Sequence, residues 1–357
     1  MPAFELEPGV VTGPALQQLF AHCKRTRCAL PAVNVINSHG VHAALQAARE
    51  AKAPVIVQLS HSGAHFFAGK FLDNKAHQAS IAGAIAGALH VRALARAYGV
   101  AVVLHSDHAA KPLLPWVEGM LAEGERYYAA HGEPLFSSHM LDLSELGLDE
   151  NLAISRRMLE RMHKLGMTLE IELGVTGGEE DGVDNSDADD SDLYTKPEEV
   201  AYVYEELMKV SDRFTIAAAF GNVHGVYKPG NVKLKPTILR DSQEYIQAKL
   251  ATAELPVDFV FHGGSGSSPA EIAEAISYGV IKMNIDTDLQ WAFWDGIRGY
   301  AADKHDFLQS QIGNPDGPDK PNKKHYDPRV WLRAGEVSFV ERVKQAFAEL
   351  NNVGTLA

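Results

Sequence analysis

Short apolar runs alternate along the chain with longer segments in which apolar residues recur every three or four positions. Eight of these runs have the length and aliphatic content of buried strands, and the segments between them have the spacing of amphipathic helices. Parallel strands need helical crossovers of this kind, so the pattern predicts eight β/α units. The predicted strands are residues 29–34, 54–59, 100–104, 134–141, 167–171, 214–220, 257–261 and 280–285.

Eight such units in one chain favour a closed (β/α)8 TIM barrel over an open sheet. We find no domain boundary, so residues 1–357 are expected to form a single α/β barrel domain. The last predicted helix lies after the eighth strand and is expected to pack outside the barrel. The predicted helices are residues 12–25, 38–52, 78–98, 113–131, 144–165, 197–210, 239–250, one that begins at Pro269, and 335–350.

Two polar segments interrupt this pattern. Residues 174–195 are acidic and rich in glycine, and they follow the fifth strand at the barrel end where mobile lids commonly lie. For most of this segment a solvated loop is the preferred interpretation, and its Asp spacing does not match an EF-hand loop. Residues 313–326 are predicted to form a second polar loop.

Composition narrows the class of protein. The net charge of −13 argues against nucleic acid or a membrane surface as the main partner, and 46% apolar residues allow a large core. No signal peptide and no 18-residue apolar run are found. Cys23 and Cys28 are expected to be reduced thiols, which together with the missing signal peptide predicts a cytoplasmic protein.

Polar residues stand at the carboxyl end of nearly every predicted strand. One polar strand end would mean nothing, because capping residues are common there, but a full set is hard to explain as turns. In a barrel these ends form the active face. The residues are Asn34, Ser60, Asp107, His108, Asp142, Glu172, His224, His262, Asn284 and Asp286.

Three of these residues, His108, His224 and His262, are candidate ligands of a catalytic zinc ion with an open fourth position. A single histidine is more often exposed or part of a core, but the shared strand-end position favours a metal site. Asp107 could move a proton beside the metal or orient a ligand histidine. Asp142 and Glu172 could hold a second metal or serve as structural hydrogen-bond partners.

The segment 257–288 reads as strand, glycine-rich turn, helix and strand. Backbone N–H groups of the turn that starts at Gly263, backed by a helix N-terminus, would make an anion site, although a flexible turn explains the sequence about equally well. Zinc can polarise a ketone, the turn can hold phosphate, and carboxylates supply acid and base. Cleavage of a C–C bond in a phosphorylated keto-sugar uses all three.

Six motifs in order resemble class II fructose-bisphosphate aldolases: HSDH, MTLEIELGVTGGEEDGVDN, FGNVHGVYKPGNV, FHGGSGS, KMNIDTD and NKKHYDPRVWLR. The resemblance extends from about Val11 to the C-terminus, and the long lid and C-terminal extension resemble the dimeric class IIA branch. It implies a cytoplasmic homodimer that reversibly cleaves fructose 1,6-bisphosphate into dihydroxyacetone phosphate and glyceraldehyde 3-phosphate in glycolysis and gluconeogenesis.

The resemblance also implies roles for individual residues. His108, His224 and His262 would bind the zinc ion, and Asp142 and Glu172 match a second divalent position. Asp107 would be the acid/base at the cleaved bond, and Glu180, beside Glu179, the lid carboxylate that moves the dihydroxyacetone-phosphate proton. The matched dihydroxyacetone-phosphate site comprises Gly225, Gly263, Gly264, Ser265, Asn284, Ile285, Asp286 and Thr287.

Two further sites follow from the same resemblance. Backbone carbonyls near Val223, Gly225 and Gly263 match a site for a monovalent cation, K⁺ or Na⁺. Groups on the aldehyde and second-phosphate side match Asn34, Ser60, Lys323 and Arg329. This chain departs from the commoner pattern in having Ser106 and Ala109 around the Asp107–His108 pair, and His61 after Ser60.

Two alternatives remain open from the sequence. A Schiff-base aldolase needs an inward lysine on a strand, and Lys282, which shares the parity of Asn284, is its one candidate. A non-catalytic phosphosugar-binding barrel or surface adhesin would need neither Asp107 beside a ligand nor a carboxylate on the lid.

Overall fold

Eight parallel strands close into a barrel in the computed structural model, which describes residues 5–174, 177–180, 183–184, 194–224, 234–264 and 267–356, with the backbone alone at 177–180, 183–184, 223 and 224. The strands follow one another in the order of the chain, and the pairing of β4 with β5 closes the ring. They are β2 (Leu30–Asn34), β3 (Val55–Leu59), β4 (Ala101–Ser106), β5 (Ser138–Leu141), β6 (Thr168–Leu173), β9 (Phe214–Ala218), β11 (Phe259–Phe261) and β12 (Val280–Ile285).

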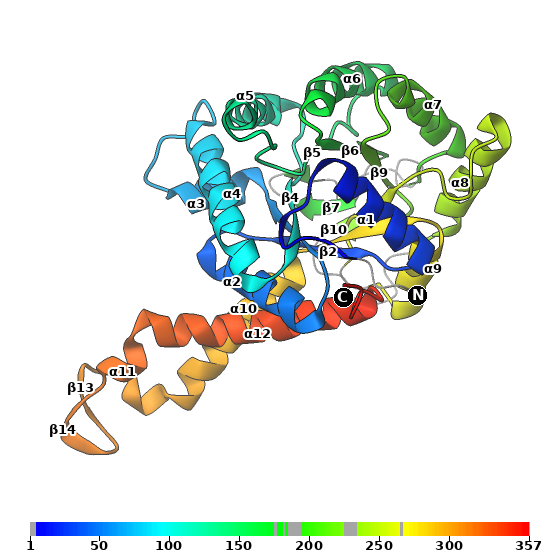
Figure 1. Cartoon of the computed structure of the whole chain (residues 1–357). Coiled ribbons are helices and arrows are strands. Elements are labelled where there is room, and N and C mark those ends of the chain that lie inside the picture. The colour runs from blue at the N-terminus through cyan, green and yellow to red at the C-terminus, as the bar shows by residue number, and fades with distance from the viewer. Residues whose placement is uncertain are drawn as a thin grey trace.

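Helices surround the barrel, as Figure 1 shows. They cover the outward-facing apolar side chains of the strands. This is the TIM-barrel architecture that the alternating pattern predicts. The helices are α1 (Gly13–Thr26), α2 (Ser38–Ala51), α3 (His61–Ala68), α4 (Gln78–Tyr98), α5 (Leu114–His131), α6 (Leu148–Lys164), α7 (Pro197–Met208), α8 (Thr237–Leu250), α9 (Pro269–Ser277), α10 (Thr287–Asp303), α11 (Lys323–Tyr326) and α12 (Pro328–Glu349).

Helix α1 closes the amino-terminal end of the barrel. Its Leu16, Leu19 and Phe20 are buried in one apolar cluster with inward-facing strand residues such as Ile56 and Ile281. The short strand β1 (Gly9–Val10) precedes α1 and pairs with the start of β4. The barrel interior beside α1 is therefore mainly apolar, apart from contacts such as the hydrogen bond from Gln17 on α1 to the Thr168 hydroxyl.

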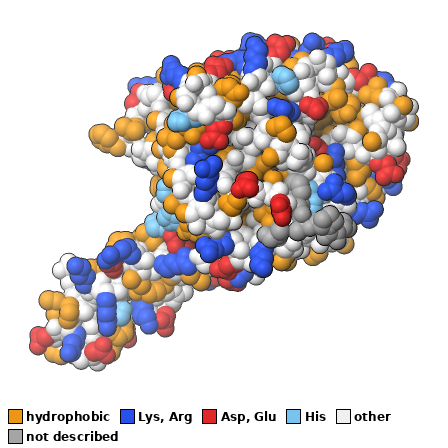
Figure 2. All heavy atoms as spheres, in the orientation of Figure 1, with side chains coloured by type: hydrophobic (Ala, Val, Ile, Leu, Met, Phe, Trp, Pro, Cys, Tyr) orange, Lys and Arg blue, Asp and Glu red, His pale blue; other side chains and the backbone are white. Residues whose placement is uncertain are grey.

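A long arm projects from the barrel (Figure 1). It consists of α10, the antiparallel hairpin β13 (Ile312–Asn314) and β14 (Gly317–Pro321), α11 and the first part of α12. Helices α10 and α12 approach closely at Gly296, where an added Cβ would lie 2.4 Å from the Ala334 carbonyl oxygen. Apolar side chains lie among charged ones on the surface of the arm (Figure 2).

The segment after β6 begins with a small second sheet. Strand β7 (Gly177–Glu180) pairs in parallel with β10 (Val223–His224) and antiparallel with β8 (Val183–Asp184). This pairing joins the predicted lid to the strand that carries His224. The remaining residues of the predicted lid up to 193 lie outside the described part of the chain.

The predicted strands and helices match the structure, with shifts at their ends. Helix 78–98 and strand 280–285 have the predicted bounds. The fourth strand begins at Ser138 rather than at residue 134, since Pro134 offers no N–H to a neighbouring strand. The last helix begins at Pro328, seven residues earlier than predicted, where Asp327 accepts a hydrogen bond from the Arg329 N–H. Helices α3 and α10 were not predicted, and the prediction of a loop at residues 313–326 was wrong, because this segment forms the β13–β14 hairpin and helix α11.

Within the described ranges, no helix is both long and apolar enough to cross a bilayer. Cys23 and Cys28 are buried free thiols on and just after α1. The structure therefore agrees with the expectation of reduced cysteines.

Candidate metal and catalytic site

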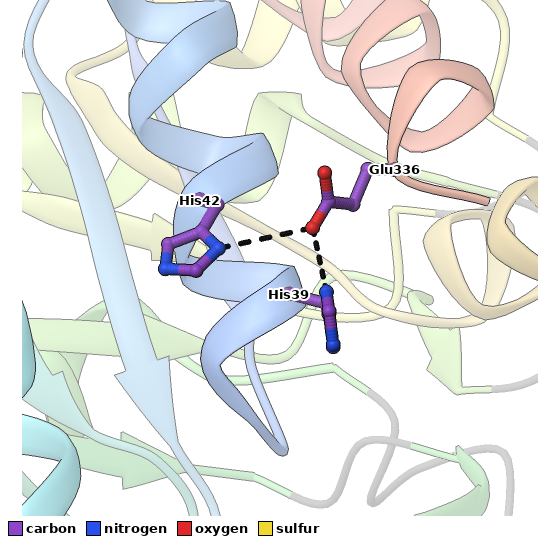
Figure 3. A group of neighbouring side chains, drawn as sticks. All are labelled: His39, His42 and Glu336. Carbon is purple, nitrogen blue, oxygen red and sulfur yellow. Dashed lines mark hydrogen bonds and ion pairs between the residues drawn. The ribbon is translucent and has the colours of Figure 1, made fainter. Parts of the chain in front are cut away.

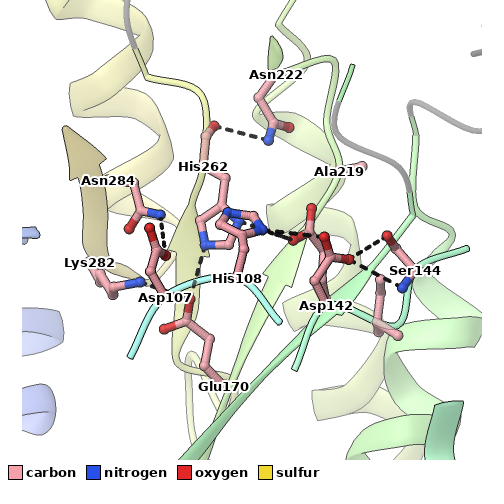
Figure 4. A network of polar contacts seen from close by, with 12 residues as sticks. Asp107, His108, Asp142, Ser144, Glu170, Ala219, Asn222, His262, Lys282 and Asn284 are labelled. Carbon is pink, nitrogen blue, oxygen red and sulfur yellow. Dashed lines mark hydrogen bonds and ion pairs between the residues drawn. The ribbon is translucent and has the colours of Figure 1, made fainter. Parts of the chain in front are cut away.

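Three metal-ligating side chains meet at the carboxyl end of the barrel (Figure 4). His108 follows β4, Glu172 lies on β6 and His262 follows β11, and their ligand atoms all lie within 4.8 Å of one another. Glu172 Oε2 is 3.5 Å from His108 Nδ1 and 3.2 Å from His262 Nδ1. The strand ends thus bring together residues that are far apart in the sequence.

Asp142, just after β5, extends this cluster. Its Oδ2 lies 3.3 Å from His108 Nδ1, and its Oδ1 accepts a hydrogen bond of 2.6 Å from the Ser144 hydroxyl. Burial acts to raise the pKa of Asp142, but its contacts with His108 and Ser144 outweigh burial and lower the pKa to about 2. Asp142 is therefore a carboxylate at neutral pH.

His262 is held between two buried carboxylates. Its Nε2 lies 2.9 Å from Glu170 Oε1, and its Nδ1 faces Glu172. Burial acts to lower the pKa of His262, but Glu172 and Glu170 raise it overall. A raised pKa favours the doubly protonated, positively charged imidazole ring of His262. A bound divalent cation would supply positive charge there in place of the second proton.

This donor set fits a divalent transition metal. Imidazole and carboxylate ligands suit zinc, and the ligand atoms of His108, His262 and Glu172 lie close enough to share one ion after small side-chain movements. The contact between His262 Nε2 and Glu170 resembles the outer-shell hydrogen bond that fixes the ring of a metal-bound histidine.

Asp107 lies next to the cluster in a chain of hydrogen bonds. Its side chain is buried, Oδ2 accepts from Asn34 Nδ2 at 2.8 Å, and Oδ1 accepts from Asn284 Nδ2 at 3.2 Å. Gln58 in turn donates to Asn34 Oδ1. The two amides orient the Asp107 carboxylate from both sides, and the sequence analysis did not identify Gln58.

A buried ion pair lies beneath the cluster. Lys282 Nζ is 2.8 Å from Glu170 Oε1, and both side chains are almost completely buried. Burial acts to raise the pKa of Glu170, but Lys282 and two neighbouring histidines lower it well below its usual value. Glu170 was not predicted, although it shares the strand parity of Glu172. The contact with Glu170 engages the Lys282 nitrogen, which disfavours the Schiff-base alternative.

The glycine-rich turn after β11 is shaped by close contacts. Gly263 has φ +61°, and a Cβ on Gly264 would lie 2.4 Å from the Met283 side chain, so both positions favour glycine. Ser268 then caps α9 by accepting a hydrogen bond from the Glu271 N–H. Asn222 Nδ2 donates to the His262 carbonyl and ties the turn to the loop after β9.

Other predicted residues lie at neighbouring strand ends. Ser60 is buried after β3, and its hydroxyl accepts a hydrogen bond from the Gly63 N–H at the start of α3. Ile285 is the last residue of β12, and Asp286 and Thr287 lead into α10. The His61 ring contacts His77 and Trp116.

Part of the predicted site lies outside the described residues, and two of its residues lie away from the metal-ligand cluster. Gly225 and Ser265 lie outside the described residues, and the side chains of four predicted residues do so as well: Glu179, Glu180, Val223 and His224. Lys323 and Arg329 lie on the arm, which projects away from the barrel (Figure 1). Arg329 is 88% exposed and pairs with Asp327. One chain therefore does not bring these two cations to its own cluster.

A closed (β/α)8 barrel with a histidine and carboxylate cluster at its carboxyl face is typical of TIM-barrel enzymes, and the cluster is a candidate metal site. Comparison with known proteins defines the family. The sequence profile described as "Fructose-bisphosphate aldolase class-II" matches residues 14–355. The chain is 58% identical to "Fructose-bisphosphate aldolase class 2" of Escherichia coli and 58% identical to "Fructose-bisphosphate aldolase" of Haemophilus influenzae, with 98% of both chains covered in each case.

A solved structure agrees with these sequence matches. The crystal structure of a fructose-bisphosphate aldolase from Campylobacter jejuni superimposes with a TM-score of 0.90 at 53% identity, covering 98% of each chain. The YdjI aldolase of Escherichia coli, at 21% identity and a TM-score of 0.64, shares the fold. The chain belongs to the class II fructose-bisphosphate aldolase family.

Proposed function

We propose that this protein catalyses the reversible aldol cleavage of fructose 1,6-bisphosphate to dihydroxyacetone phosphate and glyceraldehyde 3-phosphate, with a zinc ion bound at the barrel mouth. The observation that carries the proposal is the Asp107 carboxylate, oriented by Asn34 and Asn284 beside the ligand His108. The names of relatives that are 58% identical over nearly the full chain support the same reaction.

In this proposal His108, His224 and His262 hold the zinc ion, and Glu172 and Asp142 offer a second divalent position. Bound zinc would act as a Lewis acid on the substrate ketone. Asp107 takes the proton from the hydroxyl at the cleaved bond and returns it in the synthetic direction. Its two amide partners keep it in place for that transfer.

The lid supplies the second proton transfer. Glu180, with Glu179 beside it, moves the proton of dihydroxyacetone phosphate. The pairing of β7 with β10 supports this assignment, because Gly177 and Gly178, directly before Glu179 and Glu180, pair with the strand that carries His224. Glu180→Gln should slow exchange of this proton with solvent, measured without the aldehyde, and leave substrate affinity within a few-fold. Wild-type exchange in Glu180→Gln with slow exchange in Glu179→Gln would assign the base to Glu179.

The substrate phosphates and a monovalent cation complete the proposed site. The first phosphate and the dihydroxyacetone end bind at Gly225, Gly263, Gly264, Ser265, Asn284, Ile285, Asp286 and Thr287. Carbonyls near Val223, Gly225 and Gly263 bind K⁺ or Na⁺. Asn34 and Ser60 face the aldehyde half. The positive φ of Gly263 and the contact of Gly264 with Met283 support a turn whose backbone can approach an anion.

We also propose a cytoplasmic homodimer that works in glycolysis and gluconeogenesis, each chain forming one barrel domain. The arm supports the dimer, because Trp291 and Trp294 on α10 are 59% and 53% exposed. In a dimer, Lys323 and Arg329 on the arm of one chain can bind the second phosphate of a substrate in the barrel of the other chain. Buried free thiols are compatible with a reducing compartment.

The decisive experiment tests, in one purified sample, which bisphosphate is cleaved and whether cleavage needs a metal ion. Cleavage of fructose and tagatose bisphosphates is measured before EDTA treatment, after it, and after zinc is restored. We expect cleavage of fructose bisphosphate to stop with EDTA and to return with zinc. Cleavage that survives EDTA and is abolished by borohydride in the presence of substrate would instead establish a Schiff-base enzyme using Lys282.

A further inference from the structure

A second group of metal-ligating side chains lies outside the barrel, where α2 packs against α12. His39 and His42 come from α2 and Glu336 comes from α12, and their ligand atoms lie within 4.8 Å of one another (Figure 3). Glu336 Oε1 is 2.6 Å from His39 Nδ1 and 3.7 Å from His42 Nδ1. Both imidazoles therefore turn the same nitrogen toward one carboxylate oxygen.

Local structure accounts for this convergence. Residues three apart on a helix lie on the same face, so His39 and His42 project together from the first turns of α2. Glu336 sits near the middle of α12 and is 7% exposed, whereas the two histidine side chains are about one-third exposed. The group is thus held by two packed helices but remains accessible to an ion from solvent.

Neighbouring side chains hold the ligands in orientation. Arg333 Nη1 donates to Glu336 Oε2 at 2.8 Å, which leaves Oε1 turned toward the histidines. Burial acts to raise the pKa of Glu336, but hydrogen bonds from Arg333 and His39 lower it, so the group is a carboxylate at neutral pH. This arrangement resembles the outer-shell contacts that orient carboxylate ligands in metal sites.

His90 on α4 orients His42, as Arg333 orients Glu336. The two Nε2 atoms lie 3.3 Å apart, so one ring donates to the other. When His42 donates from Nε2, its Nδ1 carries the lone pair that faces Glu336, which is the form that binds a metal.

We propose that His39, His42 and Glu336 form a second divalent transition-metal site, most suited to zinc, that ties α2 to α12. Tetrahedral zinc with ligand bonds of about 2.0–2.1 Å places ligand atoms about 3.3 Å apart. His42 and Glu336 lie close to that spacing, and the His39 side chain must move outward by about 0.7 Å to reach it. Water completes the coordination.

The site has a structural role in this proposal. Helix α2 follows the strand that ends in Asn34, and α12 runs from the arm to the side of the barrel. An ion bound by both helices would fix the base of the arm relative to the barrel mouth. A plain ion pair among His39, Glu336 and Arg333 would give the same contacts without metal, and it is the alternative that the experiment must separate.

The test is zinc content per chain in the full-length protein, measured by elemental analysis after exposure to excess zinc and desalting. We expect the wild type to retain one more zinc ion per chain than His39→Asn/His42→Asn, with the rate of aldol cleavage unchanged. His305→Asn is the matched control, because His305 lies 3.0 Å from Asp306 as an exposed histidine–carboxylate pair that no third ligand joins among the described residues. This control should keep the wild-type zinc content.

A second variant distinguishes loss of the metal site from misfolding of the first variant. Glu336→Gln keeps the size of the side chain and a hydrogen-bond acceptor for Arg333 but removes the anionic ligand, and it too should lose one zinc ion. Added zinc should raise the melting temperature of chelator-treated wild type more than that of either variant. Equal zinc content in the wild type and in a folded variant, judged by circular dichroism, would overturn the proposal in favour of the ion pair.

Discussion

The two ends of the barrel interior differ sharply, although the same eight strands build both. At the amino-terminal end, α1 packs Leu16, Leu19 and Phe20 against apolar strand residues. At the carboxyl end, buried carboxylates, histidines and amides fill the same cross-section. Buried polar groups are costly unless they are paired, so their concentration at one end indicates a functional requirement rather than a packing solution. Substitutions at the carboxyl end should therefore affect catalysis as well as stability, whereas substitutions at the amino-terminal end should affect stability and leave catalysis unchanged.

The largest effect is expected at Asp107. Asp107→Ala removes the proposed acid/base but none of the metal ligands, so cleavage should fall by about 10²–10⁴-fold while zinc is retained. Turnover and zinc content of the same preparation check this prediction. Near-normal turnover in a zinc-replete Asp107→Ala would show that the proton is moved by another group.

The polar half should also be sensitive to unpaired charge. Glu170→Gln leaves the Lys282 ammonium buried without its carboxylate, and we expect the protein to lose about 3–5 kcal/mol of stability. Denaturant unfolding measures this loss. The matched control is Glu150→Gln, which breaks the exposed Lys111–Glu150 pair and should change stability by less than about 1 kcal/mol. Similar changes at both positions would contradict the view that burial sets the cost.

Substitutions in the apolar half should change stability but not catalysis. Leu16→Ala opens a cavity under the barrel and should cost about 2–5 kcal/mol of unfolding free energy. The kcat and KM of the folded variant should stay at wild-type values, because α1 lies at the end of the barrel opposite the site. A change in kcat with little loss of stability would mean that the two halves are coupled.

The sequence predicted the barrel well because each strand is a short apolar run bounded by turn residues, and each covering helix has one apolar face. It also predicted most of the cluster, since His108, Glu172 and His262 all stand at strand ends. Gln58, Glu170 and the pairing of Lys282 were not foreseen. These residues lie inside apolar strands, and only the folded barrel shows that Lys282 meets Glu170 and that Gln58 meets Asn34 on the neighbouring strand.

The arm and the second histidine cluster were missed for different reasons. Helix α10 exposes Trp291 and Trp294, so its pattern within one chain does not resemble a helix covering a core. His39 and His42 are three residues apart on α2, but Glu336 lies 297 residues after His39, so no local spacing joins it to them. Long-range packing of α2 on α12 creates that site.

The central claim is that a metal held by the barrel-mouth histidines is needed for aldol cleavage. Its most direct test is a zinc titration of chelator-treated wild type and His108→Ala, with cleavage of fructose 1,6-bisphosphate measured at each zinc concentration. The account predicts that wild-type activity rises from near zero and saturates with zinc, while His108→Ala stays inactive throughout. Full activity before zinc is added, or recovery of His108→Ala to wild-type turnover, would contradict it.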